Sequence, residues 1–247
     1  FSKEVFVNSG WPEEKCIVVP HGIHLEDFKD KSKVSNFKTK KKFKFLNVSI
    51  PHYRKNIDVL VDAYYNAFTD QDDVCLILKV SLKEPKYRFE CDVVKEILKI
   101  QKKHKGKRLP QVEVVQYRYD SMVPLYNSCE CLVSATSAEG FGLPLLEGMA
   151  AGMVVIAPRC TGQLDFLNDK NSLLVDVKEI DAGVKYQYWR PTPGAKTYIP
   201  VVDDLSHNML KVYNDYKNIK NKLKQESNKT AKLFTWEGAA KQILDIS

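Results

Sequence analysis

Short apolar runs alternate with amphipathic stretches along most of this chain. The apolar runs predict strands at 17–19, 43–50, 74–80, 112–116, 131–134, 154–157 and 173–175. Between them, apolar residues recur near the 3.6-residue period of a helix, over 56–68, 88–103 and 121–128, from 143 onward, and briefly near 163–167. Because strand and helix alternate, the pattern predicts an α/β fold, a Rossmann-like doubly wound parallel sheet of about six strands.

Two segments depart from this alternation. Residues 183–200 are rich in aromatic residues, proline and glycine, which predicts an extended loop or a hairpin outside the sheet. From Asp203 the pattern becomes helical to about Gln225. A last helix is expected to start at Thr235, whose hydroxyl can cap its N-terminus.

The composition is that of an ordinary globular protein, with 44% hydrophobic and 28% charged residues among 247. No run approaches the roughly 20 apolar residues of a bilayer crossing, and no signal-peptide pattern opens the chain. The six cysteines form no C-x-x-C pair and the five histidines show no metal-ligand spacing. We therefore expect buried reduced thiols, no metal site and a cytoplasmic location.

The net charge of +7 is unevenly distributed. Lysine and arginine concentrate at 38–44, 102–108 and 211–232. Solvated loops and helix faces are the favoured explanation, and peripheral contact with an anionic membrane is the alternative. No nucleic-acid motif accompanies the charge, so we expect no nucleic-acid partner.

The stretch 137–147 has the residues of an anion-binding loop. It follows the predicted strand 131–134 and opens a helix, and ligands of open α/β sheets bind beyond the carboxyl ends of the strands. Gly140 and Gly142 allow the backbone to approach a ligand closely, and Pro144 suits the first helical turn. The helix N-terminus then offers free N–H groups to an anion such as a diphosphate.

Two carboxylates frame this loop, Glu139 before the helix and Glu147 in its second turn. A carboxylate can accept two hydrogen bonds at once, which suits the vicinal hydroxyls of a ribose or a hexose. Either one alone would be interpreted as a helix-terminus or solvated surface residue. Together with the glycines and the preceding strand, the pair indicates a sugar-nucleotide site.

The run from Glu139 to Glu147, EGFGLPLLE, resembles the E-x7-E motif of family 4 retaining glycosyltransferases, whose GT-B fold has two Rossmann-like domains. Four further stretches resemble the family in the same order: 17–23 (IVVPHGI) with Phe28, 54–56 (RKN), 152–157 (GMVVIA) with Thr161-Gly162, and 234–237 (FTWE). The resemblance covers nearly the whole chain and is to the C-terminal, nucleotide-sugar-binding domain.

The resemblance implies a role for each site residue. Glu147 would bind the ribose diol of the donor, and Glu139, the candidate catalytic residue, would hold hydroxyls of the transferred sugar. Arg54 and Lys55 would neutralise the diphosphate. The loop residues Gly140, Phe141, Gly142 and Leu143 would surround the donor.

Members of this family generally need no metal or cofactor, so two cations and a helix N-terminus would stabilise the leaving diphosphate. In their front-face retaining mechanism the leaving phosphate helps to deprotonate the acceptor, which makes Glu139 a positioning group rather than a nucleophile. The nucleoside diphosphate sugar is then a substrate, not a cofactor.

The chain departs from the family at the end of the strand 43–50. There Ser49-Ile50-Pro51-His52 replaces the usual Gly-Arg, so either Arg54 substitutes for the absent arginine or the phosphate site is weakened. Tyr117 and Arg118 are candidates for base contacts or simple surface residues. Trp189 is a candidate for an acceptor cleft or for local aromatic packing.

By this resemblance, residues 1–27 end an interdomain segment and include the first strand, 28–202 form the donor-binding domain, and 203–247 form C-terminal helices. The last helix would cross toward an N-terminal Rossmann-like domain that is missing here. We expect a retaining hexosyltransferase that uses a sugar or lipid-linked acceptor and is inactive as an isolated chain. The alternative is a donor-binding module that acts with a separate acceptor-binding polypeptide.

Overall fold

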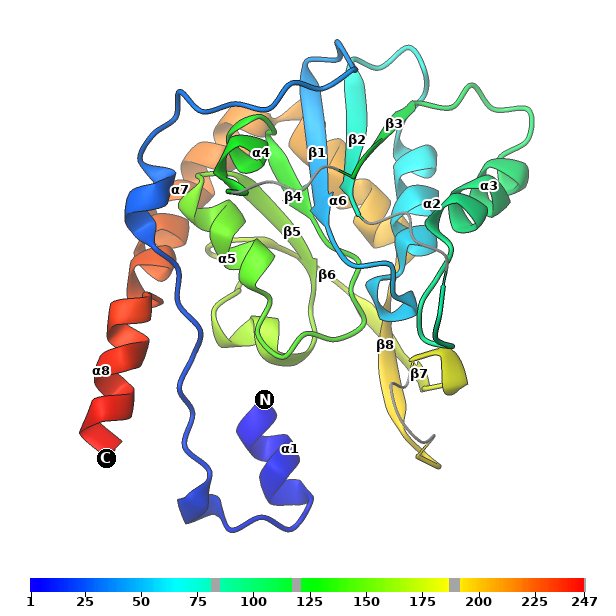
Figure 1. Ribbon diagram of the computed structural model, residues 1–247. Helices are drawn as coiled ribbons and strands as arrows, with labels where there is room; N and C mark the ends of the chain where they lie inside the picture. The colour runs from blue at the N-terminus through cyan, green and yellow to red at the C-terminus, as the bar shows by residue number, and fades with distance from the viewer. Residues whose placement is uncertain (81–84, 117–120, 187–191, 247) are drawn as a thin grey trace.

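The protein is described from a computed structural model, which covers residues 1–80, 85–116, 121–186 and 192–246. Six parallel strands form one sheet in the order β3-β2-β1-β4-β5-β6 (Figure 1). They are β1 Phe43–Val48, β2 Val74–Lys79, β3 Gln111–Val115, β4 Cys131–Val133, β5 Val154–Pro158 and β6 Leu173–Val175. The predicted Rossmann-like doubly wound sheet is confirmed.

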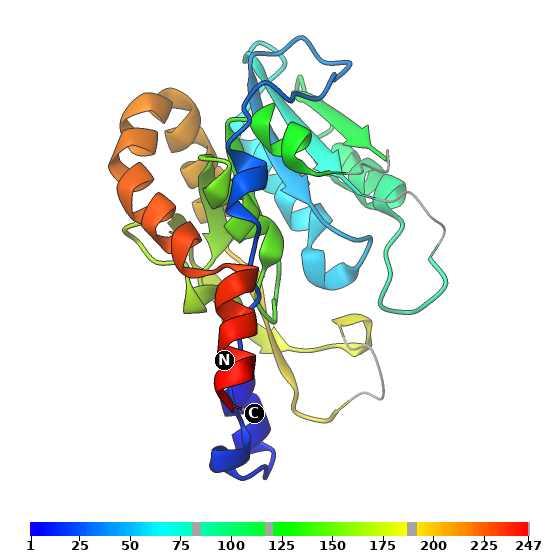
Figure 2. The ribbon, with the colours of Figure 1, turned by 60° about the vertical axis from the view of Figure 1, so that its left-hand side comes forward.

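Helices cover both faces of this sheet (Figures 1 and 2). They are α2 Ile57–Ala67, α3 Val93–Lys103, α4 Val123–Asn127, α5 Leu143–Ala150, α6 Val202–Asn214 and α7 Tyr216–Leu233; two further helices, α1 Ser2–Asn8 and α8 Trp236–Ile246, lie outside the sheet. Helices α2, α3 and α6 pack together on one face, and α5 packs with α7 on the other.

Strands β2, β4 and β5 are almost entirely apolar because both of their faces are buried, whereas the edge strand β3 (QVEVV) keeps polar residues at Gln111 and Glu113. In β2, Val74, Leu76 and Leu78 belong to the core beneath α2 and α6, whereas the intervening Cys75 and Ile77 belong to the core beneath α4 and α5. Side chains of a strand alternate between faces, so a strand buried on both sides must be apolar at every position. This is why the strand predictions from 43 onward were accurate.

The strand predicted at 17–19 does not form. The segment pairs with no strand among the residues that the structure describes, and the side chains of Ile17 and Val18 are exposed. A β-branched run favours extended backbone, but a strand also needs a neighbour for its hydrogen bonds. The preceding helix α1 was not predicted; it buries none of its residues.

The predicted hairpin is present but begins earlier than expected. Strands β7 (Val177–Asp181) and β8 (Lys196–Pro200) pair antiparallel outside the main sheet. The helix expected over 203–225 is two helices, α6 and α7, which are interrupted at Asp215, and α7 continues to Leu233. Thr235 caps α8 as expected, because its hydroxyl accepts the Gly238 N–H at 3.1 Å.

All six cysteines are free thiols and five are buried, as expected. Within the described ranges, no helix combines the length and the apolar composition that crossing a membrane would require. Hairpin β7–β8, α1 and α8 extend beyond the carboxyl edge of the sheet (Figures 1 and 2). They therefore flank the edge at which the candidate site lies.

Candidate functional site

The candidate site lies where the order of the strands reverses. Strands β1 and β4 are neighbours in the sheet, and the chain runs outward from them in opposite directions. The loops that leave their carboxyl ends diverge and form the crevice in which open α/β sheets bind ligands. The predicted cations follow β1 and the predicted carboxylate Glu139 follows β4, so both reach this crevice.

A short 3-10 helix, Tyr53–Lys55, presents the two cations. Nδ1 of His52 accepts the Arg54 N–H at 3.0 Å and caps this helix. The His52 ring is buried and stacks on Phe89. Burial and the nearby charges of Arg54 and Lys55 lower the pKa of His52 to about 4, which keeps the ring neutral and able to accept that hydrogen bond.

Asn56 joins this helix to the loop after β4. Its backbone is left-handed (φ 47°), a conformation that asparagine tolerates better than most residues. Its buried side-chain amide donates to the Ala135 carbonyl and to Ser137 Oγ, both at 2.8 Å. The Ser137 N–H in turn donates to the Arg54 carbonyl at 2.7 Å. The cations and the loop are therefore held in one fixed arrangement.

Arg54, Lys55 and Glu139 form a largely buried ion triad. Arg54 Nη1 lies 3.2 Å from Glu139 Oε2, and Lys55 Nζ donates to Glu139 Oε1. The three side chains are 21%, 12% and 15% exposed, so solvent screens these charges only partly. Burial alone would raise the pKa of Glu139, but the charges of Lys55 and Arg54 outweigh it and the pKa is lowered. Glu139 is therefore an ionised carboxylate.

The same burial lowers the pKa of Lys55, with Glu139 opposing and Arg54 adding to the shift. Counting Arg54, Lys55 and Glu139 as ionised, the triad has one positive charge in excess. A second anion at this place would be stabilised by that excess.

The loop Glu139–Leu143 leads directly into α5. Gly142 adopts φ 97°, which strongly favours glycine, and its carbonyl accepts the Leu145 N–H at 2.9 Å. A Cβ on Gly140 would meet no atom within 4 Å, so packing inside the protein does not require a glycine there. Open space beside Gly140 at a helix N-terminus is what an anionic ligand needs.

Glu147 occupies a different cavity from Glu139. Its Oε2 accepts a 2.5 Å hydrogen bond from the hydroxyl of the buried Tyr126. Burial raises the pKa of Glu147, and the Tyr126 hydrogen bond opposes that rise. Glu147 lines a cavity of about 280 Å³ together with Phe28, Met122, Leu143 and others. Sequence reasoning missed Tyr126, because nothing links positions 126 and 147 before the chain folds.

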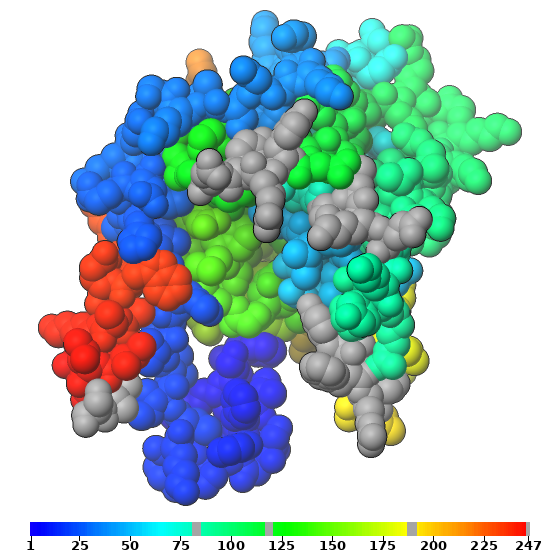
Figure 3. Space-filling model, in the orientation of Figure 1, coloured from blue at the N-terminus to red at the C-terminus, as the bar shows by residue number. Residues whose placement is uncertain are grey.

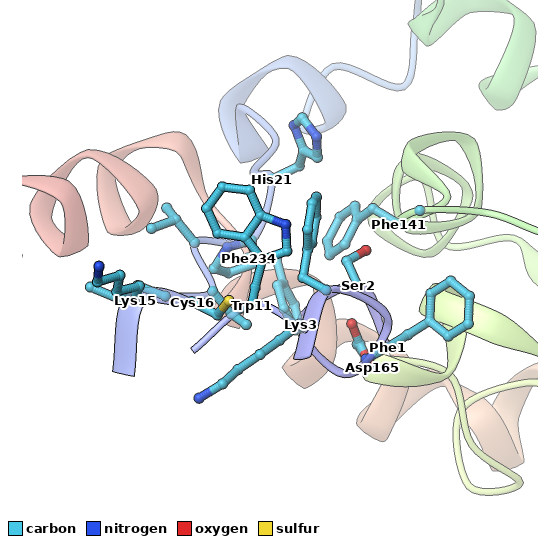
Figure 4. Close-up of a pocket in the computed structure, with 16 residues that line it drawn as sticks. Phe1, Ser2, Lys3, Trp11, Lys15, Cys16, His21, Phe141, Asp165 and Phe234 are labelled. Atoms are coloured by element: carbon cyan, nitrogen blue, oxygen red, sulfur yellow. The ribbon is translucent and has the colours of Figure 1, made fainter. Parts of the chain in front are cut away.

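A larger cavity of about 740 Å³ lies between the N-terminal segment and the loop after β4 (Figure 4). Its lining includes Phe1, Phe6 and Trp11, together with a cluster in which the ring of Phe141 contacts those of His21 and Phe234. In the space-filling view the N-terminal residues stand below that loop (Figure 3). Phe141, predicted near the donor, lines this cavity.

The structure thus brings Arg54, Lys55 and Glu139 together, with the loop 140–143 beside them, and sets Glu147 in an adjacent cavity. Tyr117, Arg118 and Trp189 lie outside the described residues. Within those residues, no three histidine, cysteine or acidic side chains converge as a metal site requires.

The order of the six parallel strands, with Arg54, Lys55 and Glu139 converging at the switch point and Glu147 on the helix that follows, is that of one Rossmann-like half of a GT-B fold. The family model for glycosyl transferases group 1 matches residues 42–185, more than half of the chain. The chain belongs to this family. No curated protein gave a significant match.

Solved structures with a similar fold include proteins described as glycosyltransferases, among them one from Rickettsia africae. The chain is similar to Anabaena HepE in complex with UDP and glucose, with 18% identity, a TM-score of 0.74, and coverage of 99% of this chain and 60% of HepE. It is also similar to sucrose-phosphate synthase from Thermosynechococcus elongatus, with 20% identity, a TM-score of 0.68, and coverage of 99% of this chain and 55% of the synthase. The C-terminal domain of LpcC from Francisella tularensis matches with 18% identity and a TM-score of 0.56, over 87% of this chain and 94% of that domain.

The chain therefore spans about 60% of the length of HepE. At these identities the likeness establishes the fold alone.

Proposed function

We propose that this chain is the donor-binding part of a family 4 retaining glycosyltransferase, which transfers a hexose from a nucleoside diphosphate sugar to a sugar or lipid-linked acceptor. The observation that supports this most directly is the convergence of Arg54, Lys55 and Glu139 at the switch point of the sheet. HepE, a protein of the same fold, has been crystallised with UDP and glucose.

In this proposal the diphosphate lies against Arg54, Lys55 and the N-terminus of α5. These groups stabilise the negative charge that develops on the leaving diphosphate as the glycosidic bond breaks. The stabilisation lowers the activation barrier without a metal. Glu147 accepts hydrogen bonds from the ribose diol in its own cavity. The Tyr126 hydroxyl keeps one Glu147 oxygen oriented while the other faces ligand.

Glu139 acts on the transferred sugar as a positioning group. Both of its oxygens are already engaged by cations, so each is a poor nucleophile but remains able to accept a sugar hydroxyl. This supports the front-face mechanism, in which the departing phosphate rather than a protein carboxylate assists the acceptor.

Transfer itself is proposed to need a second domain, on the same or a separate polypeptide. Large apolar side chains are exposed beyond the carboxyl edge, among them Phe6, Trp11 and Trp236. Apolar surface of this kind favours burial against a partner. Without a facing acceptor site the reacting atoms are not aligned, and alignment is worth about 7–11 kcal/mol of barrier.

A panel of nucleoside diphosphates and their sugars tests the proposal by thermal shift and calorimetry. Glu147→Ala removes a charged hydrogen-bond acceptor and should weaken nucleotide binding by about 1.5–3 kcal/mol, roughly 10- to 150-fold. Circular dichroism controls for folding. If no member of the panel binds, or if folded Glu147→Ala keeps full affinity, donor binding at this loop is wrong.

A radiolabelled-sugar assay with and without an added N-terminal Rossmann-like domain tests the need for a second domain. Turnover by residues 1–247 alone would contradict it.

A further inference from the structure

The chain that leaves β5 crosses directly over Glu139. The Glu139 N–H donates to Thr161 Oγ1 at 2.9 Å, and the Gly162 N–H donates to the Glu139 carbonyl at 3.0 Å. Two consecutive residues thus bind both backbone polar groups of Glu139. The contact is close, because a Cβ on Gly162 would lie 2.1 Å from the Gly140 carbonyl oxygen.

Thr161 makes this contact in a strained conformation. Its φ is 56°, in the left-handed region that a β-branched residue rarely adopts. Among the non-glycine residues that the structure describes, only Asn56 and Thr161 have positive φ, and both touch the segments that form the ion triad. Such strain persists where the surroundings fix the backbone, typically at functional sites.

Local turn geometry does not explain a threonine here. Glycine would adopt φ 56° without strain, and asparagine with little. What threonine adds at position 161 is a hydroxyl that reaches the Glu139 N–H. That bond, with the one from Gly162, fixes the backbone from which the Glu139 carboxylate reaches Arg54 and Lys55.

We propose that Thr161 is a positioning residue for the transferred sugar, because its hydroxyl fixes the backbone of Glu139 so that the carboxylate meets the hexose hydroxyls. Thr161 then has no effect on binding of the nucleotide. The inference rests on the proposed function, since it assigns Glu139 to the sugar. It separates the two halves of the donor, because Glu147, which is proposed to bind the ribose, has no contact with Thr161 among the hydrogen bonds of the described residues.

The test measures dissociation constants of UDP-glucose and UDP by calorimetry, or of the pair that the panel shows to bind best. The ratio of the two constants gives the contribution of the sugar. Thr161→Val keeps the branching and loses the hydroxyl, Thr161→Gly loses both the hydroxyl and the strain, and Thr161→Ser keeps the hydroxyl. Thr230→Val is the matched control, because Thr230 Oγ1 also accepts one hydrogen bond, from Asn171 on another part of the domain.

Val and Gly at position 161 should each reduce the sugar contribution roughly 3- to 10-fold, the value of one lost hydrogen bond, with UDP affinity unchanged. Ser should retain it. Exchange of the Glu139 amide hydrogen, followed by NMR, should accelerate in Val and Gly but not in Ser. Thr230→Val should change the melting temperature alone.

Equal losses for UDP-glucose and UDP in Thr161→Val, or an unchanged ratio with a faster Glu139 amide, would overturn the role of Thr161 while leaving donor binding intact. If wild-type protein binds no member of the panel, the proposed function fails, and the role of Thr161 fails with it.

Discussion

Neutralising Glu139 should both destabilise the free protein and strengthen its binding of a bare diphosphate. In Glu139→Gln the side chain keeps its size, but Arg54 and Lys55 lose the counter-charge they share. Two largely buried cations are then left next to each other. A diphosphate entering the crevice would replace the missing anion.

The burial of the three side chains sets the size of the first effect, and Coulomb's law gives the order of magnitude of the second. Breaking a fully buried ion pair costs about 3–5 kcal/mol. Because these side chains are 12–21% exposed, partial screening reduces the expected loss to about 2–4 kcal/mol, or roughly 5–15 °C in melting temperature. At a separation of ~8 Å and an effective dielectric of ~20–40, removing the repulsion between Glu139 and a bound phosphate is worth about 1–2 kcal/mol, a gain of about 5- to 30-fold.

Urea unfolding measures the first effect, and calorimetric titration with UDP measures the second. Asp169→Asn is the control for stability, because the pair of Asp169 with Arg159 is exposed and should contribute no more than about 1 kcal/mol. Glu147→Gln is the control for binding, since it removes a carboxylate without freeing the two cations. A Glu139→Gln protein that is as stable as wild type, or that binds UDP more weakly, would refute the charge argument.

Three further predictions concern pH, backbone approach and metal. The pKa of His52 is about 4 in the folded protein and 6.5 in the unfolded chain, so the unfolded chain binds more protons between these pH values. The free energy of unfolding should therefore fall by about 2–4 kcal/mol as the pH drops from 6.5 to 4. In His52→Asn, which can still cap the 3-10 helix, urea unfolding should show a smaller dependence on pH over this range. Gly162→Ala should lower the free energy of unfolding by about 1–3 kcal/mol or more, because its Cβ meets the Gly140 carbonyl. Gly140→Ala should change the free energy of unfolding by no more than about 0.5 kcal/mol and should weaken only donor binding. Equal stabilities of the two variants would contradict the close crossing of the two loops. EDTA should leave the affinity for the donor unchanged, and a loss restored by a divalent cation would show that donor binding needs a metal.

The fold was largely predictable because burial imposes a pattern on the sequence. Strands β2, β4 and β5 have apolar residues on both faces, so each can be predicted from a run of adjacent apolar letters, whereas polar residues alternate with valines in the edge strand β3 (QVEVV). The wrong prediction at 17–19 shows the limit of this reasoning. Ile17 and Val18 are residue types typical of a buried strand, yet they are exposed, because no strand within the described ranges lies beside them.

The site was predictable only in part. Glu139 could be named because it follows a predicted strand at the edge where open α/β sheets bind ligands, whereas Arg54 and Lys55 were named from the resemblance to the family. The contacts that orient these side chains could not be. The hydrogen bond from Tyr126 to Glu147 and the one from Glu139 to Thr161 join positions 21 and 22 residues apart. Neither spacing is periodic in any element, so no local pattern indicates them.

Strain and charge explain why such contacts collect at this edge. A stable domain would place glycine at position 161 and would avoid grouping Arg54, Lys55 and Glu139 away from water, since desolvating ions is costly. The strained backbone of Thr161 and the buried ion triad both lie beside the N-terminus of α5, on the loop where a side chain at Gly140 would meet no other atom. Arrangements that lower the stability of the free protein are retained where they contribute to ligand binding. The excess positive charge suits a diphosphate, and the fixed carboxylate suits a sugar hydroxyl. A nucleoside diphosphate sugar combines the two in one molecule, and this combination favours donor binding over a purely structural role for the domain.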